Sequence, residues 1–214
     1  SQFYQINNGI FGCEIKSVAI SGNNVFIGLY EKGLYLSSDN GNSWSKRDSG
    51  FFNRINNRIY SVVSDKDNIF VCSEKGLFLT TDSGESWEKV SNVYSHEWDR
   101  VTNVAIKGDS IYAIFYDKLY LSTNYGKNWI SKPITCDVPE VGKFYGFKSI
   151  AIKGENIYLG KNDALIRVSL SGREVKNSGL RDSSITSIIV KDNNLFVGTR
   201  AGVFMSSDDG DNWV

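Results

Sequence analysis

Short apolar runs alternate with small polar turns along the whole chain, and five stretches repeat one arrangement of the two. Each stretch holds an apolar run, a turn such as SGNN or KGEN, and a second apolar run. Val, Ile, Phe and Tyr favour strands, whereas Gly, Asp and Asn tolerate the left-handed backbone of tight hairpins. Most positions of the runs are apolar rather than alternating, so both faces of the sheets are predicted to be covered. The pattern predicts hairpins at residues 15–28, 59–72, 101–114, 147–160 and 185–198.

A third apolar run follows each hairpin, as in GLYLSS at residues 33–38 and GLFLTT at residues 76–81. Four of these runs lead into a turn of the form S/T-x-D-x-G-x-x-W or a close variant, and a fourth strand is predicted to start at the tryptophan. The four-strand unit recurs at intervals of roughly 40–45 residues, which is the size of a propeller blade. One blade cannot bury both of its faces, but neighbouring blades can cover each other.

The S/T-x-D-x-G-x-x-W turn resembles the Asp-box, or BNR, repeat of β-propellers. Sialidases, sortilin-type receptors, xyloglucan-active glycoside hydrolases and photosystem II assembly factors carry this repeat, so the resemblance implies a fold and leaves the function open. It implies a structural role for the box residues, because the acidic side chain can accept backbone N–H groups, Gly permits the turn and Trp packs against its neighbours. The matching residues are Asp39, Gly41, Trp44, Asp82, Gly84, Trp87, Asn124, Gly126, Trp129, Asp208, Gly210 and Trp213.

Two turns of the repeat pattern have features of their own. In the fourth repeat an ungapped alignment puts Leu170 in place of the Asp and Val175 in place of the Trp, so we expect this turn to close less tightly. The acidic turn at residues 208–211 lacks the spacing and the closing Glu of an EF-hand, so we predict a structural turn there and not a calcium site.

The repeats predict an all-β protein, a five-bladed β-propeller with four-stranded antiparallel blades in a single domain spanning residues 1–214. Residues 3–9 resemble the fourth strand of the other blades, while the last blade stops at Val214, where its fourth strand should start. We therefore expect the N-terminal strand to close the ring, which would remove an open edge. The alternative is a segment of a larger propeller of six or more blades. The predicted blades span approximately residues 15–58, 59–100, 101–146, 147–184, and 185–214 with 1–10.

Composition narrows the chemistry. Lys+Arg and Asp+Glu number 24 each, and this balance argues against a generally cationic nucleic-acid-binding protein. No apolar stretch approaches the roughly 18 residues of a membrane-spanning helix. A single histidine, His96, and three scattered cysteines provide neither a zinc site nor a complete disulfide framework. We predict no metal, no cofactor, no nucleic-acid partner and no membrane span. A closed ring is expected to be monomeric, and the polar surface favours an extracellular or periplasmic location.

The candidate binding residues lie in loops. In a propeller, the loops between strands two and three share one face with the loops between blades, and here these loops differ from blade to blade. They carry aromatic, arginine and carboxylate side chains, which can hold a peptide or a sugar. A register of small polar residues on the first strands, such as Ser17 and Asn103, is predicted to bond neighbouring blades. The candidate ligand-binding residues are Tyr30, Glu31, Arg54, Trp98, Arg100, Tyr116, Asp117 and Arg200.

These loops favour a non-catalytic binding propeller that presents one face to a protein or peptide partner. Repeated lectin sites would need the same loop residues in each blade, but these loops differ from blade to blade. A carbohydrate-binding lectin is therefore the alternative. A glycoside hydrolase related to sialidases is the second alternative. It would need two carboxylates a few ångströms apart, and the sialidase Phe-Arg-Ile-Pro signature is absent. No catalytic residues are predicted.

Overall fold

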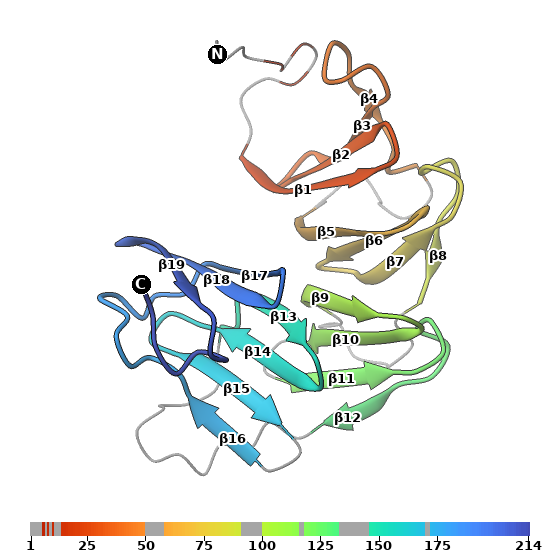
Figure 1. Ribbon diagram of the computed structural model, residues 1–214. Coiled ribbons are helices and arrows are strands. Elements are labelled where there is room, and N and C mark those ends of the chain that lie inside the picture. The colour runs from red at the N-terminus through yellow and green to blue at the C-terminus, as the bar shows by residue number, and fades with distance from the viewer. Residues whose placement is uncertain are drawn as a thin grey trace. The chain divides into compact units, whose positions relative to one another are not determined.

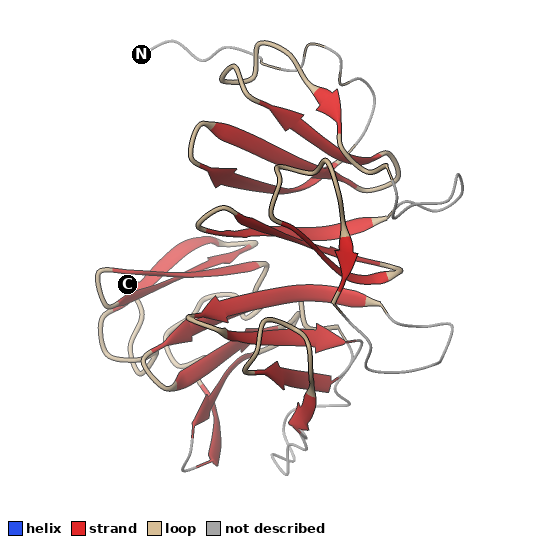
Figure 2. Ribbon diagram, turned by 90° about the vertical axis from the view of Figure 1, so that its right-hand side faces the viewer, coloured by secondary structure: helices blue, strands red, loops and turns tan. Residues whose placement is uncertain are grey.

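The computed structural model describes residues 6, 8, 10, 14–49, 58–90, 100–115, 118–132, 146–169 and 172–214. Within these residues the secondary structure consists of strands joined by turns, and Figure 2 shows no helix among them. The strands form the blades of an all-β, five-bladed propeller, as the sequence predicts. The chain divides into two compact units. One unit consists of residues 1–102 and 123–129, and the other consists of residues 103–122 and 130–214.

The first unit contains blades 1 and 2. In each blade four antiparallel strands follow one another in chain order (Figure 1). Blade 1 consists of β1 (Ile15–Ser21), β2 (Asn24–Leu29), β3 (Gly33–Ser37) and β4 (Ser45–Lys46). Blade 2 consists of β5 (Ile59–Asp65), β6 (Asn68–Ser73), β7 (Gly76–Thr80) and β8 (Glu88–Lys89).

Blade 3 begins with β9 (Val101–Lys107) at the end of the first unit and continues into the second unit with β10 (Ser110–Phe115), β11 (Lys118–Ser122) and β12 (Ile130–Lys132). Blade 4 consists of β13 (Ser149–Lys153), β14 (Asn156–Gly160), β15 (Leu165–Ser169) and β16 (Gly172–Val175). Blade 5 consists of β17 (Ser187–Lys191), β18 (Asn194–Thr199) and β19 (Gly202–Ser206). After β19 the chain returns far enough for Met205 and Val214 to exchange backbone hydrogen bonds of 2.9 and 3.0 Å.

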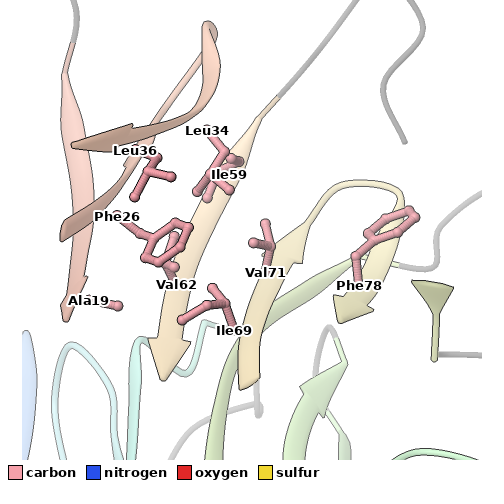
Figure 3. Packing of buried hydrophobic residues seen from close by; sticks show 9 residues of the cluster. All are labelled: Ala19, Phe26, Leu34, Leu36, Ile59, Val62, Ile69, Val71 and Phe78. Atoms are coloured by element: carbon pink, nitrogen blue, oxygen red, sulfur yellow. The ribbon is translucent and has the colours of Figure 1, made fainter. Parts of the chain in front are cut away.

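Blade 2 packs on blade 1 through the first strand of blade 2. Ile59 and Val62 of β5 lie against Phe26, Leu34 and Leu36 of blade 1 (Figure 3). The approach is so close that a Cβ atom at Gly28 would lie 2.5 Å from Cγ2 of Ile59.

The same arrangement recurs in the second unit. Ile185 packs into the core of blade 4, and a Cβ atom at Gly160 would lie 2.5 Å from Cγ2 of Ile185. Blades 2 and 5 therefore dock on the preceding blade through the same repeat position.

Three strands, β1, β17 and β19, depart from the prediction that both faces of every sheet are covered. Val62, which packs on the preceding blade, is 3% exposed, but Val18 at the equivalent position of β1 is 57% exposed. Ile15 and Ile20 on β1 are also exposed, as are Ile189 and Val203 in blade 5. An apolar run is therefore buried where a neighbouring blade packs on it within the described residues. The run itself does not differ between the two situations.

Polar side chains also join the blades, as predicted for the first strands. The Ser17 hydroxyl donates to the Val62 carbonyl oxygen at 3.1 Å and accepts from the Val62 N–H at 2.9 Å. In the second unit, Asn103 Nδ2 donates to the carbonyl oxygen of Lys148 at 3.1 Å.

The turns after the third strands, which we call the box turns, are closed by their own side chains. In the first, the Ser37 hydroxyl donates to Asp39 Oδ1 at 2.7 Å and accepts from the Gly41 N–H at 2.8 Å. Asp39 also accepts from the backbone N–H and the hydroxyl of Ser43. These hydrogen bonds hold the pKa of Asp39 at about 2, and those around Asp208 hold its pKa at about 2 as well. Asn124 keeps one part of this pattern by accepting the Asn128 N–H at 2.9 Å.

Each box tryptophan fastens a neighbouring strand. The indole Nε1 of Trp87 donates to the Arg47 carbonyl oxygen at 2.9 Å, and that of Trp129 to the Val90 carbonyl oxygen at 2.8 Å. Both acceptors end the outer strand of the preceding blade. Trp213 donates to the carbonyl oxygen of Lys176 at 3.0 Å in the same manner.

Trp44 has the equivalent partner in the N-terminal segment. Its Nε1 donates to the Ile6 carbonyl oxygen at 2.9 Å, and Asn8 Nδ2 donates to the Asn42 carbonyl oxygen at 3.3 Å. Ile6 therefore takes the position on blade 1 that Arg47 takes on blade 2. The other residues of the predicted closing strand, Phe3, Tyr4, Gln5, Asn7 and Gly9, lie outside the described residues.

Blade 4 has no box turn, and its register corrects the ungapped alignment. β16 pairs Val175 with Ile166 and Arg173 with Val168. The Lys176 N–H donates to the Leu165 carbonyl oxygen, as the Arg47 N–H donates to that of Leu34. Since Trp44 stands three residues before Arg47, the equivalent residue in blade 4 is Arg173. The placement of Val175 at the tryptophan position is therefore wrong by two residues, because the hairpin of this blade is shorter.

An ion network occupies the outer hairpin of blade 4. Arg167 donates to both carboxylate oxygens of Glu174 at 2.8 Å. Lys176 contacts Glu174 at 2.6 Å and Asp211 of the next box turn at 2.5 Å. Hydrogen bonds from Arg167 first, and from Lys176, hold the pKa of Glu174 at about 2.

Two further sequence predictions concern the cysteines and membrane insertion. Cys72 is a fully buried thiol in β6, and its burial raises its pKa. Cys13 and Cys136 lie outside the described residues. The described residues contain no helix that is long and apolar enough to cross a membrane.

Candidate functional site

Antiparallel pairing gives each blade two different edges. The hairpin between the first and second strands and the box turn lie at one edge. The start of the first strand and the loop between the second and third strands lie at the other, which we call the loop edge. In blade 1 the Tyr30 N–H donates to the Glu14 carbonyl oxygen at 3.0 Å, and in blade 2 the Glu74 N–H donates to that of Arg58 at 3.2 Å. These bonds bring the loop and the strand start together.

Chemically active side chains occupy equivalent positions along this edge. Glu14, Arg58 and Arg100 each precede the first strand of a blade. Tyr30 and Glu74 each follow the second strand of a blade. Because the positions repeat and the residues differ, neighbouring blades present unlike groups to each other.

A backbone irregularity adds two more side chains. The β1–β2 register shifts between Ile15 and Ser17, and the β5–β6 register shifts between Ile59 and Ser61. Lys16 and Tyr60 are the residues left over at these shifts. Such a bulge re-aims a side chain at the end of a strand.

These residues form a cluster of two tyrosines and three cations in the first unit. The rings of Tyr30 and Tyr60 meet edge to face, with centroids 6.5 Å apart and planes at 68°. Lys16 Nζ lies 5.0 Å and the Arg58 guanidinium 5.2 Å from the Tyr30 centroid. The Arg100 guanidinium lies 4.3 Å from the Tyr60 centroid. We call Lys16, Tyr30, Arg58, Tyr60 and Arg100 the tyrosine–cation cluster.

Carboxylates border part of this cluster. Glu14 pairs with Lys16 at 2.5 Å. Arg58 lies 3.8 Å from Glu31 and 4.0 Å from Glu74, and both distances exceed those of a good hydrogen bond. Arg58 Nε and Glu74 Oε2 are buried and have no hydrogen-bond partner. The guanidinium of Arg58 is therefore stacked and attracted by charge, but it is not fixed by hydrogen bonds among the described residues.

The hydroxyl of Tyr60 is affected by burial and by several charged neighbours in the cluster. Burial raises the pKa of its hydroxyl above the ordinary value, and the charge of Arg100 opposes this effect. Glu74, Tyr30 and Arg58 also act on the same hydroxyl. The phenol therefore stays neutral near pH 7 and can donate or accept a hydrogen bond.

The structure brings together three of the residues predicted to bind a ligand. Tyr30 and Arg100 belong to the cluster, and Glu31 borders it. Arg200 is exposed in the turn between β18 and β19, in the other unit. Arg54, Trp98, Tyr116 and Asp117 lie outside the described residues.

Sequence reasoning missed Lys16 and Tyr60 and left Arg58 and Glu74 out of the binding set. Lys16 and Tyr60 both follow the first apolar residue of a repeat, where the other repeats have Thr102, Lys148 and Thr186. Tyr60 is the one aromatic residue at this position, but only the strand pairing shows that the position is a bulge. Within the described part of the chain, no group of three His, Cys, Asp or Glu side chains could hold a metal ion.

No protein-family model and no curated protein matches this sequence. Solved structures do match it in fold. The extracellular domain of the one-component system BT4673 of B. thetaiotaomicron is 18% identical with a TM-score of 0.69, over 92% of this chain and 28% of that one. The GH74 xyloglucanase of Xanthomonas campestris is 16% identical with a TM-score of 0.61, over 94% of this chain and 31% of that one.

A third similar structure is YCF48 bound to D1 peptide. It is 16% identical with a TM-score of 0.65, over 94% of this chain and 68% of that one. This chain is thus structurally similar to BNR and Ycf48-like propellers, and it spans less than a third of the BT4673 domain. At these identities the likeness concerns the fold alone.

Proposed function

We propose that this chain is a non-catalytic binding propeller that holds a peptide segment of a partner protein at the loop edge of blades 1 and 2. The tyrosine–cation cluster is the observation that carries the proposal. Tyr and Arg are the side chains that most often dominate protein interfaces, because they combine a rigid apolar surface with hydrogen-bond donors. Here Tyr30 and Tyr60 supply the surface, and Arg58 and Arg100 supply the donors.

The asymmetry of the loop edge supports a single site. The residue that follows the second strand is Tyr30 in blade 1 and Glu74 in blade 2, and the residue that precedes the first strand changes from Glu14 to Arg58. A lectin with one sugar site in each blade would repeat these residues. The unlike side chains along the loop edge suit an extended peptide, whose successive side chains differ.

The comparisons support the proposal at the level of the fold. One structure with this fold, YCF48, was solved with a D1 peptide bound. Another similar structure is the extracellular domain of a one-component system, and a third is a xyloglucanase, so this fold serves binding as well as catalysis.

An array of synthetic peptides tests the proposal. The labelled full chain is applied to immobilised random 12-residue peptides and, in parallel, to a glycan array at physiological salt. We expect saturable binding to a subset of peptides, with Tyr60→Ala weakening it at least about tenfold, as expected for a central aromatic contact.

Lys148→Ala is the matched control, because Lys148 stands at the position of Tyr60 in blade 4 and is exposed. It should bind the same peptides as the wild-type chain. If the folded chain binds no peptide and binds glycans, the proposal is wrong and the chain is a lectin. Equal binding by Tyr60→Ala and the wild type would move the site away from this cluster.

A further inference from the structure

The cations of the tyrosine–cation cluster are not equally neutralised. Lys16 has Glu14 at 2.5 Å, and Arg58 has Glu31 and Glu74 within 4.0 Å. Arg100 is exposed, and among the described residues no carboxylate lies within ion-pair distance of it. Among the described residues, its guanidinium contacts the ring of Tyr60. One positive charge at this edge therefore faces solvent with its hydrogen-bond donors unused by the described part of the chain.

We propose that Arg100 receives a carboxylate of the bound peptide. This inference rests on the proposed function and names the chemistry that the site selects. A guanidinium that lies over an aromatic ring uses its face for that contact and keeps its N–H donors in its own plane. Those donors match the two oxygens of a carboxylate, which a guanidinium binds through two parallel hydrogen bonds.

Tyr60 positions this guanidinium. The ring centroid lies 4.3 Å from the guanidinium carbon, and the ring itself is braced edge to face by Tyr30. Arginine loses considerable rotamer freedom when it is held in one geometry, and a stacked side chain has lost part of that freedom before the ligand arrives. The stacking therefore favours binding of the carboxylate over a free arginine on a mobile loop.

The neighbouring charges favour a singly charged group. Glu31 and Glu74 lie within 4.0 Å of Arg58, and Glu74 also acts on the hydroxyl of Tyr60, over whose ring Arg100 lies, so a second negative charge on the ligand would meet more like charge. Phosphate carries nearly two charges near pH 7 and would be repelled more strongly than a carboxylate. A sugar hydroxyl could accept from Arg100 but would leave its charge uncompensated.

Peptides printed in sets of three test this inference. Each array hit is presented with its free C-terminus and its acidic side chains, with an amidated C-terminus, and with Asp and Glu changed to Asn and Gln. We expect one of the two modified forms to bind the wild-type chain at least about tenfold less tightly, since a charge-assisted bidentate contact is lost. The form that loses affinity shows whether the carboxylate is terminal or belongs to a side chain.

Three variants separate the residue from the fold. Arg100→Gln should bind the carboxylate and carboxamide forms alike, so that the preference falls from about tenfold to about one. Arg100→Lys keeps the charge without the paired donors and should retain part of the preference. Arg181→Gln, which replaces an exposed arginine of blade 4, should keep the wild-type preference.

The outcomes distinguish the two proposals. Peptide binding by the wild type with no preference for the carboxylate form, or a preference that survives Arg100→Gln, overturns the role of Arg100 and leaves peptide binding intact. Failure of the folded wild-type chain to bind any peptide overturns both.

Discussion

The box carboxylates show how a single residue sets a turn. Asp39 accepts hydrogen bonds from Ser37 and from the backbone and side chain of Ser43, and each of these bonds favours the charged form. Its pKa falls from the usual 3.8 to about 2 for this reason. Asn124 occupies the same position in blade 3 and keeps the bond to the backbone without a charge.

A pH titration of stability tests this role. A carboxylate whose pKa is lower in the folded state stabilises the fold above about pH 4, and that contribution disappears as the pH falls towards about 2. We expect the urea midpoint of the wild type to drop over this range and that of Asp39→Asn to drop less. The midpoints are measured by fluorescence between pH 2 and pH 7. Parallel curves for the two chains would contradict the prediction.

Replacing the indole with the smaller phenyl ring of Phe removes its hydrogen bonds and keeps an aromatic side chain. Trp213 is 8% exposed and donates to the carbonyl oxygens of Lys176 and Gly210 at 3.0 and 3.1 Å. Trp213→Phe should lower the free energy of unfolding by about 1–3 kcal/mol, because two buried carbonyl groups lose their donor. Urea unfolding measures the change. A loss below about 0.5 kcal/mol would mean that water replaces the indole at this site.

The outer hairpin of blade 4 shows what an element does without a box turn. β16 pairs with β15, and Glu174 on β16 accepts from Arg167 on β15 and from Lys176 directly after β16. Lys176 also contacts Asp211 in the box turn of blade 5, so the network links the two blades. The residue at the tryptophan position of this blade is Arg173, and Glu174 next to it forms the ion network.

Glu174→Gln tests how much the ion network stabilises this hairpin. We expect a lower melting temperature, because Arg167 and Lys176 keep their charges and lose a shared partner. Glu155→Gln is the control, since Glu155 pairs with Lys107 and both side chains are exposed. If the two variants melt alike, the network contributes no more than an isolated exposed pair.

Blade stacking determines which apolar residues form the core. Val18 and Val62 have the same side chain and the same place in the repeat, but Val62 packs on blade 1 and is 3% exposed, whereas Val18 is 57% exposed among the described residues. Burial, and not residue type, distinguishes them.

This pair allows a matched measurement. Val62→Ala should cost about 1–3 kcal/mol of unfolding free energy, through lost apolar contact and a new cavity. Val18→Ala should change it by less than about 0.5 kcal/mol. Equal effects in urea unfolding would show that β1 is covered in solution as β5 is.

Across the whole molecule, the sequence predicted the strands and blades well because repetition makes each blade a check on the others. It misplaced Val175, because a hairpin shortened by two residues leaves no mark in an ungapped alignment. It found Tyr30 and Arg100, which stand in recognisable loops. It did not find Tyr60, because a bulge depends on the pairing of two strands and turns a residue of an apparently continuous strand towards the loop edge.

The tryptophan clamps also impose an order on assembly. Each indole holds a carbonyl group that lies earlier in the chain, at sequence separations of 38, 40, 39 and 37 residues. A ribosome therefore releases the outer strands of blades 1, 2 and 4 before it releases the tryptophan that bonds each of them. Until that tryptophan emerges, each of these strands has only the backbone pairing within its own blade.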